Sequence, residues 1–198
     1  SPITLSPPML LHNQTQAIQR MNTLAKEGKD FFFIINYRAD SAYIEEFTNI
    51  DPRELLFSFP TLSNIPEAES YSNEAVEWNT EPPTREDYEH HINLVKQRER
   101  EGDSYLANLT CKIPVHTNLS LHDIFMRSKA LYRCWMKEKF VCFSPEIFVR
   151  ITEQGEISSY PMKGTIDATR PNAEKELMDN KKEAAEHATI VDLIRNDL

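Results

Sequence analysis

The apolar run Phe31–Ile35 restricts the fold more than any other part of the chain. All five of its residues are aromatic or β-branched, which is typical of a strand that is covered on both faces. The run is far too short to cross a membrane, since a spanning helix needs about 20 apolar residues. We therefore expect a strand over 31–37 in the interior of a globular domain that mixes helices and sheets.

Helices are predicted on either side of this strand. Residues 14–27 carry apolar side chains at helical spacing and end at Gly28. Thr84 with Asp87, and Ser120 with Asp123, match the capping-box pattern of a helix start. In the helix that starts at Thr84 and ends at Gly102, we expect a stripe of buried residues at Tyr88, His91, Ile92 and Val95. In the helix from Ser120, we expect core positions for Ile124, Leu131 and Trp135. A helix or broken helix pair is predicted from Ala173 onward.

Short strands joined by turns make up most of the rest. Gln154–Gly155 is expected to form a hairpin turn, and residues 64–79 a surface loop. The fold class that follows is α+β, with mostly antiparallel sheets flanked by helices. Besides 31–37, strands are predicted over residues 43–47, 55–59, 104–113, 140–143, 146–152 and 156–160.

The composition is ordinary for a soluble globular protein, with 198 residues of which 40% are hydrophobic and 27% charged. The net charge of −9 argues against nonspecific nucleic-acid binding, which needs basic patches. An acidic protein can still hold a small anionic substrate in a locally positive pocket. No segment favours export or a membrane, and a cytoplasmic location is expected.

Cysteines and histidines give no sign of a metal centre. The three cysteines lack C-x-x-C spacing and are expected to be reduced core residues rather than disulfides or metal ligands. The six histidines show no ligand spacing with them and are interpreted as structural or surface residues. These residues are Cys111, Cys134, Cys142, His12, His90, His91, His116, His122 and His187.

Lys163 stands at the end of a predicted strand, in the stretch Pro161–Thr165. A lysine there is either a solvated charge or a functional group. Gly164 permits a tight turn or a close backbone approach to a ligand, and the Thr165 hydroxyl suits a carboxylate or phosphate. The glycine-rich spacing of a P-loop is missing, so nucleotide binding is not expected.

Two glutamates can likewise be interpreted either as solvated charges or as functional groups. Glu146 follows Ser144 and Pro145 and is either an exposed residue at a strand edge or a general acid–base group. Glu186 shares a predicted helical face with Ile190, Leu193 and Asp197, and it is either a solvated charge or a cation ligand.

The stretches Ser144–Glu146, Pro161–Thr165 and 185–198 together resemble the chorismate-utilising enzymes, and the lysine resembles the nucleophile of the aminodeoxychorismate synthase branch. The resemblance implies that residues 9–198 form the N-terminal part of such a catalytic domain, with the C-terminal part absent, after a loose lead-in over 1–8. It implies an enzyme that converts chorismate and ammonia to 4-amino-4-deoxychorismate for 4-aminobenzoate and folate synthesis. A glutamine amidotransferase subunit would supply the ammonia.

The resemblance also implies a role for each candidate residue. Lys163 would form a covalent adduct with the ring, Glu146 would protonate the leaving hydroxyl, and Gly164 and Thr165 would contact substrate. Glu186 would bind the Mg²⁺ that holds the ring carboxylate. In relatives that make anthranilate or isochorismate, a small residue takes the place of the lysine.

Two other functions remain open. The chain could belong to an anthranilate or isochorismate synthase, against which Lys163 argues. It could also be a non-catalytic half-domain that binds a partner or forms a homodimer through unpaired strand edges.

Overall fold

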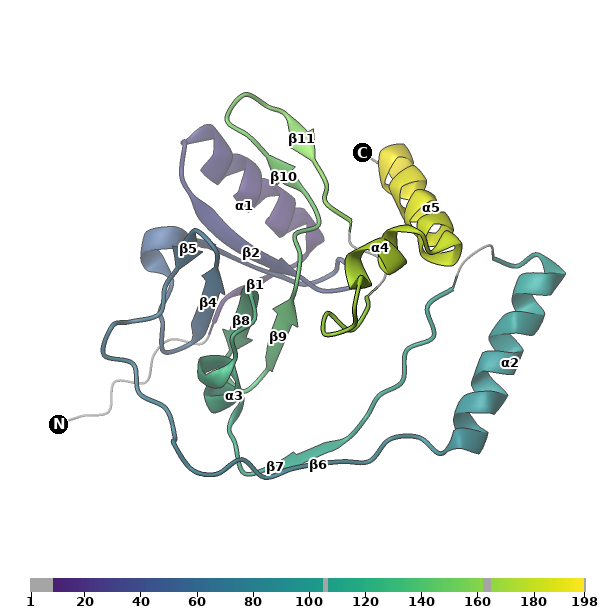
Figure 1. Ribbon diagram of the computed structural model, residues 1–198. Helices are drawn as coiled ribbons and strands as arrows, with labels where there is room; N and C mark the ends of the chain where they lie inside the picture. Colours follow the sequence, from purple (N-terminus) through teal and green to yellow (C-terminus); the bar gives the residue numbers. More distant parts are fainter. Residues whose placement is uncertain (1–8, 105–106, 162–164, 198) are drawn as a thin grey trace. The chain divides into compact units, whose positions relative to one another are not determined.

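The computed structural model describes residues 9–104, 107–161 and 165–197 (Figure 1). The predicted lead-in over 1–8 therefore lies outside the described residues. The chain divides into two compact units, one formed by the segments up to Glu69 and from Ser128 onward, the other by Ser70–Arg127. All strand pairs that the structure describes are antiparallel, and helices accompany them, which confirms the α+β class. No described helix is both long and apolar enough to span a bilayer.

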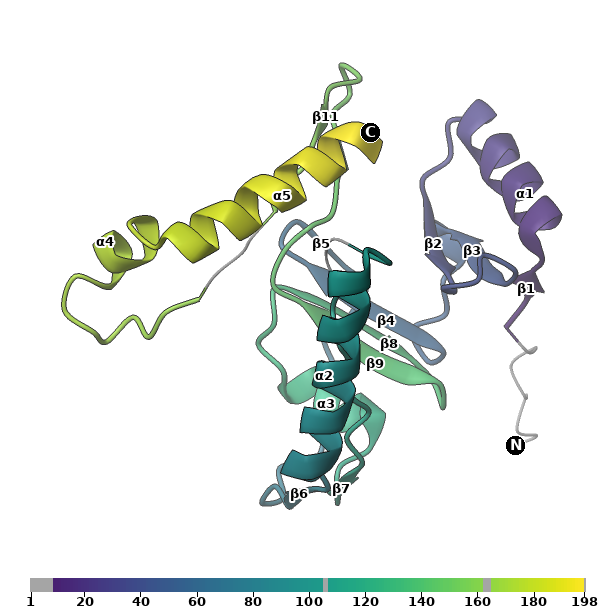
Figure 2. The same cartoon turned by 90° about the vertical axis from the view of Figure 1, so that its right-hand side faces the viewer.

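The larger unit contains a sheet with the strand order β1 (Leu11–His12), β3 (Ala42–Glu46) and β2 (Phe31–Ile35). Helix α1 (Gln14–Lys26) covers one face of this sheet, as Figure 2 shows. Its side chains Ala17 and Leu24 pack against strand residues that alternate toward the helix. The Asn13 side chain caps α1 by accepting a hydrogen bond from the Gln16 amide at 3.0 Å.

The second sheet of this unit has the order β5 (Leu62–Ser63), β4 (Leu55–Phe59), β8 (Tyr132–Met136) and β9 (Phe140–Ser144). The main core lies between the two sheets. Phe57 at its centre stacks on Phe32 with ring centroids 4.7 Å apart and meets the edge of Phe47 at 5.3 Å. A single 3₁₀ turn (Phe47–Asn49) leads from the first sheet to the second.

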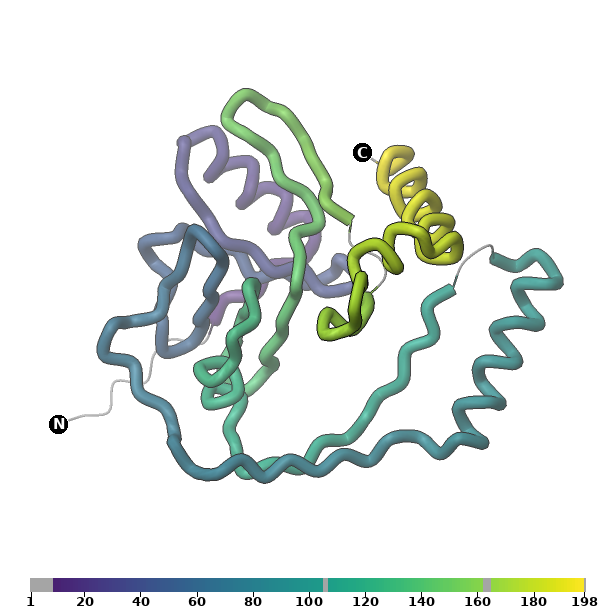
Figure 3. The backbone as a smooth tube through the Cα atoms, in the orientation of Figure 1, coloured from purple at the N-terminus to yellow at the C-terminus, as the bar shows by residue number. Residues whose placement is uncertain are grey.

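The chain then runs from β9 through residues 145–149 into a small hairpin and back toward two helices, a path that is followed most easily in Figure 3. The hairpin pairs β10 (Arg150–Ile151) with β11 (Ile157–Ser158), and Gly155 in its turn has a φ of +80° that favours glycine. Helices α4 (Ala173–Met178) and α5 (Lys181–Asp197) confirm the predicted broken helix pair.

The smaller unit contains α2 (Arg85–Glu101), α3 (Leu121–Arg127) and the two-stranded ribbon β6 (Trp78–Thr80) with β7 (Val115–Thr117). Both predicted capping pairs form. The Asp87 amide donates to the Thr84 hydroxyl at 3.1 Å, and the Asp123 amide donates to the Ser120 hydroxyl at 3.0 Å. Hydrogen bonds from Ser120, and from the Ser72 amide, hold the pKa of Asp123 below its usual range.

Several sequence predictions were wrong in this region and beside it. Residues 107–114 are not in a strand, and the hydrogen bond from the Glu81 amide to the Pro114 carbonyl oxygen, at 3.0 Å, extends the β6–β7 ribbon by a single contact. The helix from Ser120 ends at Arg127, and Trp135 instead lies in β8 opposite Leu56. Helical spacing at Trp135 was coincidental, since pairing with the buried strand β4 decides its conformation.

Burial also differs from the prediction at two elements. Helix α2 buries none of its side chains in the structure, and Tyr88 is 45% exposed. Strand β2 was predicted to be covered on both faces, but it lies at the edge of its sheet, and Phe33 and Ile35 remain exposed. Of the three cysteines, only Cys134 is a core residue.

Candidate functional site

A cavity of about 310 Å³ lies where the chain leaves β9, where it leaves β11, and along one face of α5. It combines one carboxylate and two hydroxyl groups with an apolar wall. Such a mixture is typical of sites for small molecules, in which a few polar groups orient the ligand. The lining residues are Ser144, Glu146, Ile147, Phe148, Ser159, Pro161, Ile190 and Ile194.

A tight turn at the end of β9 positions Glu146. The Ser144 hydroxyl donates a hydrogen bond to the Glu146 carbonyl oxygen at 2.7 Å, and the Glu146 amide donates back to the same hydroxyl at 3.4 Å. Pro145 has no amide hydrogen and cannot continue the ladder, so β9 stops at Ser144. The strand predicted over 146–152 was therefore wrong except at Arg150–Ile151, and Glu146 lies half-buried in the turn instead.

The segment after β11 forms the second side of the cavity. The Ser159 hydroxyl donates to the Phe148 carbonyl oxygen at 2.7 Å and so ties this segment to the chain that follows Glu146. Pro161 lines the cavity with Glu146. Lys163 and Gly164, two of the predicted site residues, follow Pro161 by two and three positions in the sequence and lie outside the described residues.

Helix α5 supplies the third side. Its half-buried side chains are Glu183, Glu186, Ile190 and Ile194, which follow one another at spacings of three and four and so share one face. Ile190 and Ile194 reach the cavity. Leu193, seven residues after Glu186, lies beside this face as predicted, but it is 47% exposed and is not among the residues that line the cavity.

Glu186 is one helical turn before Ile190 on the same face, but it is not among the residues that line the cavity. Its carboxylate forms an ion pair with Lys182, with 3.6 Å between Oε1 and Nζ. Among the described residues, no three side chains of His, Cys, Asp or Glu come together as a metal site. Thr165 is exposed, outside regular secondary structure and outside the cavity lining.

Sequence reasoning missed Phe148, Ser159 and Ile194. The spacing of four between Ile190 and Ile194 is a helical signal that was available in the sequence. Nothing local marks Ser159, since its hydrogen bond joins residues 11 positions apart.

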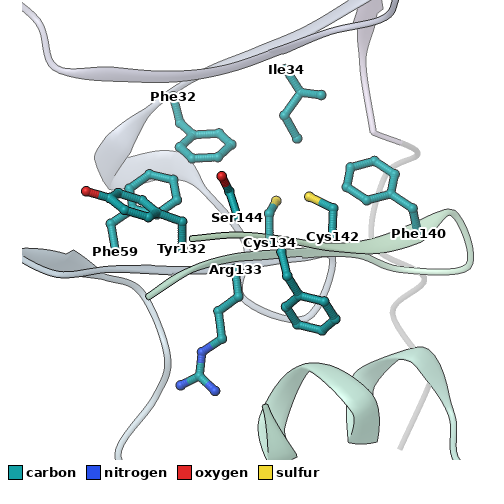
Figure 4. Close-up of a pocket in the computed structure, with 10 residues that line it drawn as sticks. Phe32, Ile34, Phe59, Tyr132, Arg133, Cys134, Phe140, Cys142 and Ser144 are labelled. Atoms are coloured by element: carbon teal, nitrogen blue, oxygen red, sulfur yellow. The ribbon is translucent and has the colours of Figure 1, made fainter. Parts of the chain in front are cut away.

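A second cavity, of about 240 Å³, lies between the two sheets of the larger unit (Figure 4). Its wall is almost entirely apolar and aromatic, and none of the predicted site residues that the structure describes lines it. Phe32 and Ile34 reach it from β2, and Cys134 and Cys142 reach it from β8 and β9.

The chain is similar in sequence to several known proteins. The chain is 38% identical over 181 residues to an uncharacterized PabA-like protein of Pasteurella multocida (strain Pm70), an alignment that covers 91% of the chain and 56% of that protein. It is 32% identical over 127 residues to anthranilate synthase component 1 of Acetivibrio thermocellus (58% of the chain, 26% of that protein). It is 28% identical over 130 residues to aminodeoxychorismate synthase component 1 of Bacillus subtilis (strain 168) (59% and 27%).

The chain thus spans little more than half the length of the PabA-like relative. No solved structure matches it significantly. Residues 14–198 match the sequence profile of the chorismate binding enzymes, which covers most of the chain and all three sides of the Glu146 cavity. The chain belongs to the chorismate binding enzyme family.

Proposed function

We propose that the residues around the Glu146 cavity form part of the active site of an aminodeoxychorismate synthase. The enzyme converts chorismate and ammonia to 4-amino-4-deoxychorismate and water. A glutamine amidotransferase supplies the ammonia. The observation that carries the proposal is the Glu146 cavity, because it gathers the turn after β9, the segment that leads to Lys163, and the face of α5 that bears Glu186.

Glu146 is the general acid of the proposed reaction. Loss of a ring hydroxyl is slow unless the leaving oxygen receives a proton, and a positioned carboxylic acid can donate it. The hydrogen bonds between Ser144 and the Glu146 backbone fix the base of this side chain, which limits the positions that its carboxyl group can take. Ile190 and Ile194 give the cavity an apolar wall on the side of α5.

Lys163 is the nucleophile. Its neutral amine forms a carbon–nitrogen bond with the ring while the carbon–oxygen bond of the 4-hydroxyl breaks, and Glu146 turns the departing oxygen into water. Ammonia then forms its own bond to the ring, and the lysine amine leaves. Covalent catalysis of this kind divides one difficult displacement into two easier ones.

Glu186 is the proposed ligand for Mg²⁺. An oxygen donor suits this ion, which binds proteins through as few as one or two carboxylates and completes its shell with water and substrate. The Glu186 carboxylate, on the half-buried face of α5, is a ligand of the type that such a site uses. When bound, the ion would neutralise the charge of the substrate's ring carboxylate.

The test is to identify the product. A protein that contains this chain and extends over the full length of its relatives is incubated with chorismate, ammonium and Mg²⁺, and is then quenched and analysed by mass spectrometry. We expect 4-amino-4-deoxychorismate and a trapped adduct on Lys163. Absence of turnover with saturating ammonium, in a protein that is folded, would contradict the proposal.

Anthranilate synthesis is the second candidate, supported by the 32% identity to an anthranilate synthase component. It requires direct attack by ammonia and no lysine adduct. Anthranilate as the product, with an unmodified Lys163, would therefore favour this candidate.

Glu146→Gln should lower the rate constant for product formation by about 100-fold or more, because glutamine keeps the shape of the side chain and loses the acidic proton. The binding of chorismate should change much less. Rapid-quench kinetics at saturating chorismate measure the effect. Glu153→Gln is the matched control, since Glu153 is exposed and lies outside the cavity lining. A normal rate in Glu146→Gln would exclude Glu146 as the acid.

Glu186→Gln should raise the Mg²⁺ concentration that gives half-maximal chorismate binding by about tenfold, because the amide cannot replace the charge of the carboxylate. Isothermal titration at several Mg²⁺ concentrations measures this shift. Glu183→Gln changes a half-buried glutamate on the same face and serves as the control. If both variants keep the magnesium dependence of the parent, the ligand assignment is wrong.

A further inference from the structure

Cys134 and Cys142 face each other directly across the β8–β9 hairpin. Side chains of directly opposed residues in antiparallel strands have Cβ atoms about 4.5–5.5 Å apart, and a disulfide needs about 3.5–4.5 Å. Figure 4 shows both sulfur atoms on the same side of the sheet, pointing into the cavity between the sheets. The Cys134 thiol donates a hydrogen bond to the Cys142 sulfur.

We propose that Cys134 and Cys142 form a modification site, which a hydroperoxide closes to an intramolecular disulfide. Neither cysteine lines the Glu146 cavity. Neither thiol forms a disulfide in the structure. Closing the disulfide needs a movement of about 1 Å between the Cβ atoms, which two strands of a hairpin can absorb by a small change of twist.

Cys142 reacts first. It is exposed, whereas Cys134 is only 8% exposed. Burial raises the pKa of the Cys134 thiol to about 12. Burial also raises the pKa of Cys142, and hydrogen bonds from Cys134 oppose that rise only in part, so that exposure rather than a lowered pKa makes Cys142 the first to react.

The reaction balances in two steps. The Cys142 thiolate attacks one oxygen of the hydroperoxide, the oxygen–oxygen bond breaks, and the product is a sulfenic acid together with an alcohol or water. The Cys134 sulfur then attacks the Cys142 sulfur, and the hydroxyl leaves as water with the proton of the Cys134 thiol. The hydroperoxide is reduced by two electrons, which the two thiols supply.

Closure changes the cavity between the sheets. Two thiols that line its wall become one disulfide, which ties neighbouring positions of β8 and β9 together. The wall at this point loses a hydrogen-bond donor and part of its freedom to move.

Peptide mapping tests the proposal directly. Trypsin cleaves after Arg133, Lys137, Lys139 and Arg150, so it releases the two cysteines on separate peptides, 134–137 and 140–150. The reduced protein is treated with one equivalent of hydrogen peroxide, acid-quenched and alkylated before digestion without reductant. We expect a linked pair of these peptides, a mass loss of about 2 Da and the loss of two of the three thiols.

Cys111→Ser is the matched control and should keep the linked pair, because Cys111 lies in the other unit and is exposed. Cys142→Ser should leave Cys134 as an alkylatable thiol. Phenylarsine oxide, which bridges two neighbouring thiols, should bind to the untreated protein and to Cys111→Ser, and should bind at least tenfold more weakly to Cys142→Ser. Oxidation of Cys111 or of Cys142 alone, without the linked peptides and without arsenical binding, would overturn the proposal.

Discussion

Lys163→Ala should lower the rate of 4-amino-4-deoxychorismate formation by at least about 1,000-fold, the scale of loss that follows when a covalent catalyst loses its nucleophile. The remaining groups of the site would still bind chorismate, so the loss should be in the rate constant rather than in substrate affinity. Single-turnover kinetics with mass-spectrometric detection of the product separate the two.

The same variant distinguishes the two candidate chemistries. Without the lysine, ammonia can reach the ring directly, and an anthranilate-like product would then become the main one. Lys139→Ala removes a lysine from the β8–β9 turn and should keep the parent rate. A normal rate and normal product in Lys163→Ala would remove Lys163 from the mechanism, whatever the fate of Glu146.

Phe57→Ala should lower the free energy of unfolding by about 3–5 kcal/mol, because it removes a large side chain from a closely packed core. Phe57 is fully buried, and three aromatic rings lie within 5.3 Å of its own, measured between centroids. Trp135, buried in the neighbouring strand β8, is a fluorescent probe of this sheet. Urea denaturation in a Trp78→Phe background isolates its signal.

Phe33→Ala is the control for this stability measurement. Phe33 lies in the first sheet and is 53% exposed, so its truncation should change the free energy of unfolding by less than about 1 kcal/mol. Equal losses in both variants would mean that the core does not lie between the sheets as described.

Local sequence patterns predicted the helix starts after Thr84 and Ser120 and the helix end at Gly102. Thr84 and Ser120 cap their helices through hydrogen bonds with residues three positions away, and Gly102 ends α2 with a φ of +88°. These contacts involve only neighbours in the chain, so the sequence carries their whole signal. The turn at Gly155 between β10 and β11 was predicted from a local pattern too, because its positive φ favours glycine at that position.

Long-range pairing was less visible. Residues 55–59 gave only a weak strand pattern, yet β4 is the most deeply buried strand of the molecule as described, with Leu55, Leu56 and Phe57 all at 1% exposure or less. Its partner β8 was predicted as helix. The strand over 55–59 is confirmed and the helix over β8 was wrong, and the weak signal at both has one cause, since the two strands are more than 70 residues apart and each is stabilised by the other.

The candidate site also has a part that the sequence predicts and a part that depends on the tertiary structure. The sequence alone determined the residue types: a lysine before a glycine, a glutamate after Ser144 and Pro145, and a glutamate on an apolar helix face, together with the family resemblance that the comparison confirmed. Only the tertiary structure decided that Glu146, Pro161 and Ile194 share one cavity, because a cavity is formed by segments that approach through folding, and no local pattern encodes that approach.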